Sequence, residues 1–199
     1  MGELVIRRAV PADFAAIVAL NSGEVRHTSP MDGARLRRLD ALAAWHQLAV
    51  LDGQPAAFIL ALRDHVAYRN DNYEWFAARQ ASFLYIDRIV IARPRRGGGR
   101  GRAFYADVQS FAEVRWPQLA CEVFLQTGND PALLFHGSFG FREVGQNVMP
   151  ASGIRASMLL KEMCSYPFVA ETYGGKLPDL PWLRTRPLPG RQAALATGT

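Results

Sequence analysis

The sequence predicts a single α/β domain of the α+β kind, in which a mixed central sheet of about six to seven strands is flanked by about four helices. The chain has 199 residues, 49% of them hydrophobic, which is enough for one substantial core and short for two. Segments with the period of a strand alternate with segments with the period of a helix, and one strand-like segment, Phe83–Ile91, is apolar on both faces, as in a central strand. We expect the domain over residues 1–162 and an irregular, proline-rich tail over residues 163–199.

The first half of the chain begins with a strand and a helix. Pro11 stands at the first position of that helix, where its missing N–H costs nothing. Farther on, Asp52-Gly53 separates two apolar segments, which is a strong signal for a tight β-hairpin. The expected elements are a strand over Glu3–Arg8, helices over Pro11–Asn21 and Gly33–Ala44, strands over His46–Leu51 and Ala56–Leu62, and a loop with a short helix over Asp64–Gln80.

The second half is organised around the strand Phe83–Ile91. Apolar residues then recur at helical spacing in Phe104, Val108 and Phe111, which predicts a helix to about Val114. Strict alternation along the central strand predicts one face made of Phe83, Tyr85, Asp87, Ile89 and Ile91. The remaining expected elements are a strand over Cys121–Gln126, a helix over Asp130–Gly137, and strands over Gly140–Val144 and Ile154–Leu160.

Composition argues against membrane, disulfide and metal functions. No run of 18 apolar residues is present, and the first residues lack the features of a signal peptide. The two cysteines, Cys121 and Cys164, stand in no zinc-like spacing. We therefore expect a soluble, cytoplasmic protein with no metal and no membrane partner.

The charge balance is basic and comes almost entirely from arginine. The formal net charge is +5 and the pI is near 9.6, with Lys161 and Lys176 as the only lysines. A polyanionic ligand such as a nucleotide cofactor or an RNA would explain this balance, and so would an arginine-rich composition without functional meaning.

Arginine and glycine concentrate in one segment, Arg95–Arg102, which lies between a strand and a helix. Glycines let the backbone approach a ligand, and the N–H groups at a helix N-terminus favour phosphate oxygens. Arginines add charge-assisted hydrogen bonds. The segment lacks the Gly-Lys-Ser/Thr of a Walker A loop, and it does not fit the dinucleotide-binding fingerprint.

Two motifs together resemble the GNAT superfamily of N-acetyltransferases. Arg96-x-x-Gly99-x-Gly101, which follows Ile89-Val90-Ile91, is similar to the superfamily's motif A, which cradles the pyrophosphate of CoA. Downstream, Asn129-x-x-Ala132-x-x-Phe135-His136-x-x-x-Gly140-Phe141 is similar to motif B. The resemblance covers residues 4–160, and the order of the expected elements agrees with the superfamily's fold.

The resemblance implies a set of residues that bind acetyl-CoA or another acyl-CoA as the co-substrate. The backbone of Ile89 and Ile91 would pair with pantetheine, the amides of residues 97–102 would hold the pyrophosphate, and Asn129 would contact the pantetheine arm or the neighbouring strand. The implied cofactor-binding residues are Ile89, Val90, Ile91, Arg96, Gly97, Gly98, Gly99, Arg100, Gly101, Arg102, Asn129 and Phe135.

Three residues are candidates for catalysis. The superfamily usually has a tyrosine at the position of His136, where it protonates the leaving thiolate; a histidine could do this, or it could be packed in the core. Asp87 is the candidate general base, with a salt bridge to an arginine as the alternative. Tyr85 is a further candidate on the same strand, and with Tyr68, Tyr73 and Trp75 it could line the acceptor pocket.

The resemblance implies transfer of an acetyl or short acyl group from acyl-CoA to a primary amine of a small molecule, by direct attack in a ternary complex. One alternative is an aminoacyl-tRNA donor on the same fold, and another is a non-catalytic acyl-CoA-binding module. The acceptor pocket is expected within residues 21–42 and 63–80. The aromatic tail predicts packing over the domain or over a partner subunit of a homodimer.

Overall fold

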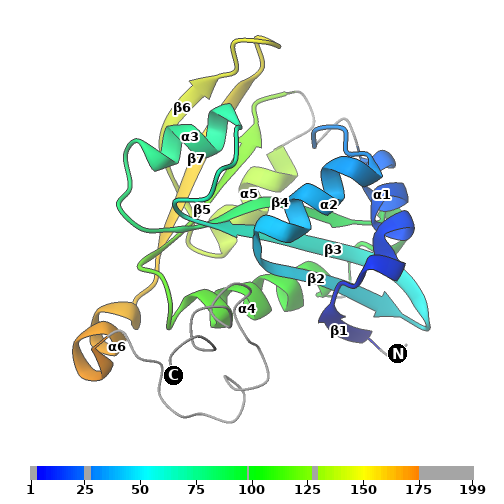
Figure 1. The fold of residues 1–199 in the computed structure, drawn as a ribbon, viewed down its shortest axis with the longest axis horizontal. Coiled ribbons are helices and arrows are strands. Elements are labelled where there is room, and N and C mark those ends of the chain that lie inside the picture. Colours follow the sequence, from blue (N-terminus) through cyan, green and yellow to red (C-terminus); the bar gives the residue numbers. More distant parts are fainter. Residues whose placement is uncertain (1–3, 25–27, 98, 127–129, 175–199) are drawn as a thin grey trace, which may run out of the picture.

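The protein folds around one seven-stranded sheet in the order β1-β2-β3-β4-β5-β7-β6 (Figure 1). The computed structural model describes residues 4–24, 28–97, 99–126 and 130–174. Neighbouring strands are antiparallel except for β4 and β5, which are parallel. The strands are β1 (Leu4–Arg8), β2 (Ala43–Leu51), β3 (Gln54–Arg63), β4 (Leu84–Ile91), β5 (Gln118–Phe124), β6 (Arg142–Val148) and β7 (Arg155–Glu162). This mixed sheet confirms the expected fold class.

Helices cover both faces of the sheet (Figure 1). They are α1 (Phe14–Ser22), α2 (Gly33–Leu42), α3 (Asp71–Ala77), α4 (Arg100–Ala112), α5 (Asp130–Ser138) and α6 (Tyr166–Tyr173), with 3-10 turns η1 (Pro11–Asp13) and η2 (Arg93–Arg95). Helices α1, α2 and α3 share one core with Leu60 of β3, whereas α4 and α5 share the other with Ile59. We call these two sides the α2 face and the α4 face. No described helix is long and apolar enough to cross a lipid bilayer.

Local sequence signals explain where several elements begin and end. The hairpin between β2 and β3 turns at Asp52 and Gly53, whose φ angles of 52° and 74° match a type I′ turn. The Asp32 side chain caps α2 by accepting a hydrogen bond from the Arg35 amide at 2.7 Å. Helix α2 ends at Leu42, two residues earlier than expected, because Ala43 is already extended and begins β2.

The expectation of an irregular tail is wrong for residues 166–173, which form α6. Pro167 lies in the first turn of this helix, where a proline is tolerated. Glu113 accepts a hydrogen bond from the Ser165 amide at 2.6 Å and so fixes the start of the helix against α4. Val169 is buried, and Gly174 ends the helix with a positive φ of 56°. Residues 175–199, on which most of the tail prediction falls, lie outside the described residues.

A β-bulge interrupts β4 at Asp87. In the register with β3, Ile86 lies opposite Ala61 and Arg88 lies opposite Leu60, so Asp87 is the extra residue. Tyr85, before the bulge, is buried on the α2 face, whereas Ile89 after it packs on the α4 face. The expectation that Phe83, Tyr85, Asp87, Ile89 and Ile91 share one face is therefore wrong, because a single inserted residue reverses the alternation.

The parallel strands β4 and β5 stay together for only two residue pairs. Leu84 lies opposite Leu119, and Tyr85 lies opposite Ala120. Strand β5 pairs with β7 from Gln118 to Phe124, and after Ala120 it pairs with β7 alone. Among the described residues, β4 therefore has no strand partner on its β5 side from Ile86 to Ile91. We call the point where the two strands separate the fork.

Candidate active site

The unpaired edge of β4 presents backbone groups from Ile89 and Ile91. The Ala92 amide donates to the Ala56 carbonyl at 3.0 Å, which makes Ala57 and Ile91 a pair that is not hydrogen-bonded. The N–H and C=O of Ile91 therefore point away from β3, and those of Ile89 do the same two residues earlier. The side chain of Val90, in contrast, is buried in the core. Ile89 and Ile91 thus offer the backbone edge that the motif resemblance implied.

The glycine loop has the backbone form that a close ligand approach requires. Gly97 and Gly99 have φ angles of 86° and 76°, which L-residues with a side chain rarely adopt. Gly99 is the N-cap of the 13-residue α4, and its carbonyl accepts the first helical hydrogen bond, from Ala103. A Cβ at Gly97 or Gly99 would meet no atom within 4 Å, so space for a ligand lies beside this backbone. Gly98 and Asn129 lie outside the described residues, as does the side chain of Arg100.

Gly101 joins the two motifs in space. A Cβ at this position would lie 3.1 Å from the Cδ1 atom of Ile91 and 3.1 Å from ring atoms of Phe135. The ring of Phe135 also packs edge-on against Tyr105 of α4 at 5.0 Å. The end of β4, the start of α4 and helix α5 therefore meet at Gly101, and only a residue without a side chain fits there unaltered.

The arginines of the loop have partners of their own. Arg96 donates from Nε to the Ile91 carbonyl at 3.1 Å and forms an ion pair with Glu24 at 2.8 Å. Arg93 forms a second ion pair with the same carboxylate at 3.2 Å. Arg102 lies over the ring of Phe139, with 5.5 Å between its guanidinium carbon and the ring centroid. Arg96 thus ties the loop to β4 and to the residues after α1.

His136 is buried in an aromatic cluster. Its Nδ1 atom lies 2.7 Å from the Ala132 carbonyl, and its ring packs edge-on against Tyr105 at 5.4 Å and against Phe141 at 5.7 Å. Burial lowers the pKa of His136 below its usual value. Because a carbonyl only accepts, Nδ1 carries the proton, and in the neutral ring Nε2 carries none. This geometry supports the packed histidine more than a proton donor.

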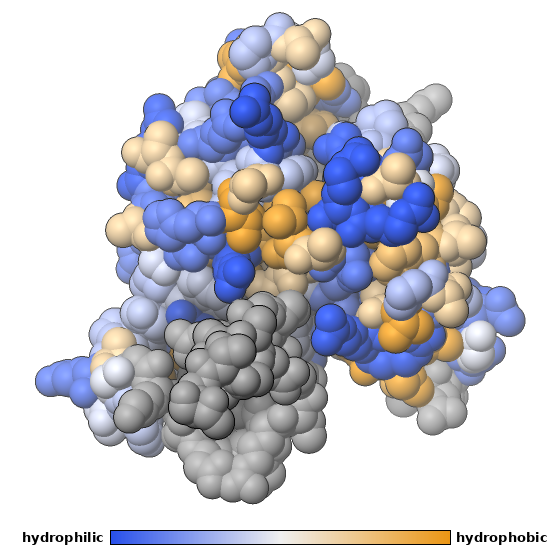
Figure 2. Space-filling view, viewed as in Figure 1, coloured by the Kyte–Doolittle hydropathy of each residue, from blue (hydrophilic) through white to orange (hydrophobic). Residues whose placement is uncertain are grey.

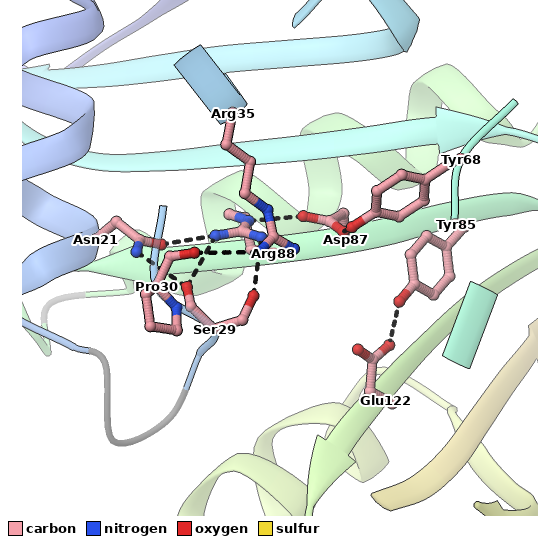
Figure 3. Close-up of polar contacts among 9 residues, drawn as sticks. All are labelled: Asn21, Ser29, Pro30, Arg35, Tyr68, Tyr85, Asp87, Arg88 and Glu122. Atoms are coloured by element: carbon pink, nitrogen blue, oxygen red, sulfur yellow. Dashed lines mark hydrogen bonds and ion pairs between the residues drawn. The ribbon is translucent and has the colours of Figure 1, made fainter. Parts of the chain in front are cut away.

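Asp87 is held in a buried network (Figure 3). Its two carboxylate oxygens accept hydrogen bonds from the Tyr68 hydroxyl at 2.5 Å and from Nε of Arg88 at 2.6 Å. The bulge permits this contact between neighbours, which would lie on opposite faces of a regular strand. Arg88 also donates to the Asn21 side chain at 2.9 Å and to the Ser29 hydroxyl at 3.2 Å. Both oxygens of Asp87 are therefore engaged, and its environment favours the salt bridge over the base.

Glu122 is a candidate site residue that the sequence analysis did not identify. It lies on β5 two residues after Ala120, and Asp87 lies on β4 two residues after Tyr85, where Tyr85 and Ala120 form the last pair at the fork. Glu122 accepts a hydrogen bond from the Tyr85 hydroxyl at 2.7 Å. Burial raises the pKa of Glu122 to about 7, while hydrogen bonds from Tyr85 and Asn72 oppose the increase. The signal in the sequence was a lone glutamate between Cys121 and Val123, inside an otherwise apolar strand. A carboxyl group with this pKa can accept and release a proton at neutral pH.

Tyr85 and the other aromatic candidates divide into separate roles. Burial raises the pKa of Tyr85 well above its usual value, so it stays a neutral donor to Glu122. Tyr73 is also buried and donates to the Arg63 carbonyl at 2.9 Å. Trp75 packs against Gly145 of β6, where a Cβ would come within 2.8 Å of its ring. Tyr68 alone among them contacts Asp87 directly.

Comparisons with solved structures identify the fold. The ribosomal-protein-S18-alanine N-acetyltransferase from Escherichia coli aligns over 81% of this chain and 94% of its own, with a TM-score of 0.61 at 15% identity. An acetyltransferase of the GNAT family from Streptococcus pneumoniae aligns over 81% and 99%, with 0.61 at 22% identity. Arabidopsis thaliana Naa50, in complex with the bisubstrate analogue CoA-Ac-MVNAL, aligns over 80% and 98%, with 0.61 at 15% identity.

The chain therefore has the fold of the GNAT N-acetyltransferases. No protein-family model matches the sequence, and no curated protein matches it at the sequence level. At these identities the likeness establishes the fold, and the activity has to be argued from the site.

Proposed function

We propose that the protein transfers an acetyl or short acyl group from acyl-CoA to a primary amine of a small molecule, by direct attack in a ternary complex. The observation that carries the proposal is the position of Glu122, whose pKa is about 7, at the fork beside the unpaired edge of β4. A neighbour of the same fold, Naa50, was solved with a CoA bisubstrate analogue. Acyl-CoA would supply the thioester that the amine attacks.

On the donor side, the backbone of the chain would do most of the binding. The N–H groups of Ile89 and Ile91 face the side from which β5 has separated, so they could pair with the amides of a pantetheine arm. The amides at the start of α4, around Gly99, would hold the pyrophosphate. Arg96 would keep the loop in shape through Glu24 and the Ile91 carbonyl, and it would also add positive charge nearby.

On the acceptor side, Glu122 would act as the general base. An alkylamine is protonated at neutral pH, and only the neutral amine attacks a thioester, so a group must remove that proton. The raised pKa of Glu122 suits this step. With a pKa near neutral pH, a large fraction of the group is ionised, and the carboxylate is a stronger base than one with an ordinary pKa. Tyr85 and Asn72 would hold the carboxylate in place.

Asp87 and His136 take other roles in this proposal. Asp87 would keep Arg88 and Tyr68 in position, because both of its oxygens are engaged. His136 would support the contact between α5 and α4, since its ring is buried and its proton is directed at the Ala132 carbonyl. The leaving thiolate would then take its proton from solvent. A general-acid role for His136 stays a prediction that the variants described in the Discussion test.

The test is an acetyl-CoA titration followed by a turnover assay. Calorimetry with acetyl-CoA should give saturable binding, and Gly99→Asp should abolish most of it, because it places a strained residue and a negative charge at the phosphate site. Thiol release should then depend on an added amine. Absence of binding in the wild-type protein would refute the acyl-CoA donor and favour an aminoacyl-tRNA. Binding without release across a broad amine panel would favour a non-catalytic binding module.

A further inference from the structure

The Arg35 guanidinium on the α2 face lies close to the buried network around Asp87. Arg35, from the first turns of α2, reaches toward Asp87 and Tyr68 (Figure 3). Its partners are neutral: it donates to the Pro30 carbonyl at 3.2 Å and lies within hydrogen-bonding reach of the Tyr68 hydroxyl. Within the described residues Arg35 takes part in no ion pair.

The guanidinium of Arg35 forms no ion pair with the acidic groups described near it. Asp87 accepts hydrogen bonds from Tyr68 and Arg88, one at each oxygen, and the Asp32 carboxylate accepts from the backbone amide of Arg35. Burial, together with the charge of Asp87, raises the pKa of Tyr68, so the phenol stays uncharged. A half-buried guanidinium whose hydrogen bonds go to neutral oxygens keeps a positive charge that no ion pair compensates, and it can bind an anion in a bidentate manner.

The other arginines of α2 are in a different situation. Arg37 and Arg38 are exposed, and the negative charge of Asp32, the N-cap residue, acts on both of them. Figure 2 shows hydrophilic side chains gathered over α2, with apolar side chains exposed between α2 and α3. Of the three, only Arg35 combines partial burial with contact to the network around Asp87.

We propose that Arg35 binds a carboxylate on the acceptor, so that the substrate is a small zwitterion such as an α-amino acid. The ammonium group of this substrate would face Glu122, and its carboxylate would face Arg35. In Figure 3, Glu122 and Arg35 lie on opposite sides of the Tyr68–Asp87 pair. The charges are complementary, because the ionised form of Glu122 pairs with the ammonium and Arg35 pairs with the carboxylate. This inference rests on the proposed acyl transfer and defines the class of its acceptor.

The experiment compares acceptors that differ in one group. Each of the standard amino acids is offered with acetyl-CoA beside its carboxamide, together with aminoalkylphosphonates and a peptide with a free N-terminus and an amidated C-terminus. We expect kcat/KM to favour at least one amino acid over its carboxamide by ~10- to 100-fold, the range for a hydrogen-bonded charge pair. In Arg35→Gln this ratio should collapse toward one, in Arg35→Lys it should be partly kept, and in Arg38→Gln, the matched control on the same helix, it should persist.

The outcomes separate the two proposals. If acetyl-CoA does not bind, both the proposed function and the carboxylate site are refuted. If acetyl-CoA binds but carboxamides or the amidated peptide serve as well as every amino acid, only the carboxylate site is refuted. Phosphonates that serve better than every amino acid would also refute it, because the preferred anion would then not be a carboxylate. A specificity ratio that survives Arg35→Gln would also refute it. Because the ratio is measured within one variant, a general loss of folded protein cannot imitate the expected result.

Discussion

The ring of Phe135 lies 3.1 Å from the point that a Cβ on Gly101 would occupy. Alanine at this position would gain ~0.5 to 1 kcal/mol of helix propensity, and it would force Phe135 or Ile91 to move. We expect the second effect to prevail, so that Gly101→Ala lowers Tm and weakens acetyl-CoA binding in calorimetry. Gly137→Ala is the matched control, because Gly137 is helical, exposed and has no atom within 4 Å of its Cβ position. If both variants melt above the wild type, Gly101 is not under steric constraint.

Replacement of Glu122 by glutamine should remove the base. We expect kcat to fall by ~10²- to 10⁴-fold at pH 7.5. In the wild type the rate should rise with pH through about 7, the pKa of Glu122, whereas Glu122→Gln should lose this limb of the profile. If the turnover of Glu122→Gln stays within threefold of the wild type, Glu122 is not the general base.

Glu122 should also make the free energy of unfolding depend on pH. Its pKa is raised from 4.5 to about 7 in the folded protein, so the folded state binds more protons than the unfolded state between these values. The free energy of unfolding should therefore decrease from pH 4.5 to 7, by roughly 2 to 3 kcal/mol from this group. Denaturation of the wild type and Glu122→Gln at pH 5 and pH 7 should show a smaller decrease in the variant. Equal decreases would mean that the pKa is not raised.

His136 can be tested with two replacements. His136→Phe keeps an aromatic ring in the cluster and cannot donate a proton, whereas His136→Ala leaves a cavity that costs ~2 to 4 kcal/mol. Packing predicts that His136→Phe keeps more than a third of wild-type turnover at saturating acceptor and melts above His136→Ala. General acid catalysis predicts a loss of ~10²-fold or more in both.

The stability of the wild type should depend on this histidine at low pH. Because burial lowers the pKa of His136 in the folded state, the unfolded state binds the extra proton first as the pH falls below about 6.5. The wild type should therefore lose stability on acidification relative to His136→Phe, in which this group is absent. Parallel Tm curves of the two proteins from pH 7.5 to 5.5 would contradict a lowered pKa.

The buried pair of Asp87 and Arg88 should stabilise the fold and take no direct part in catalysis. Asp87→Asn leaves the Arg88 guanidinium uncompensated, and we expect a loss of ~3 to 5 kcal/mol in the free energy of unfolding. The double variant Asp87→Asn, Arg88→Met should recover part of this loss, because it removes the unpaired charge. A loss of turnover in Asp87→Asn with unchanged stability would instead restore Asp87 as the candidate base.

Patterns with a local cause were predictable from the sequence. The Asp52-Gly53 turn, the apolar period of the helices and the glycine loop before α4 each follow from neighbouring residues. Features that depend on distant pairing were not. The bulge at Asp87 is set by the register with β3, and it moved Tyr85 away from the face of Ile89. The proposed role of Glu122 appears only when β5 lies beside β4, since burial and the charge of Asp87 raise its pKa.

The fork divides the sheet into two pieces that are each continuous along the chain. Residues 4–91 make the antiparallel meander β1 to β4, and residues 118–162 make β5 to β7. Each piece contains one hairpin of local pairings, β2–β3 or β6–β7, which forms quickly. The pairings β1–β2 and β5–β7 join residues about as far apart in the chain as the two parallel pairs at Leu84 and Tyr85 do. Both hydrophobic cores contain residues of both halves, so the two hairpins can form early but the cores are completed only when the halves dock. Native-state hydrogen exchange should therefore find the highest opening energies in residues that both halves bury. The unpaired backbone edge of β4 would then take its final form only when the second half docks. Because β5 pairs with β4 at two residue positions only, most of the strand keeps this edge available to a ligand.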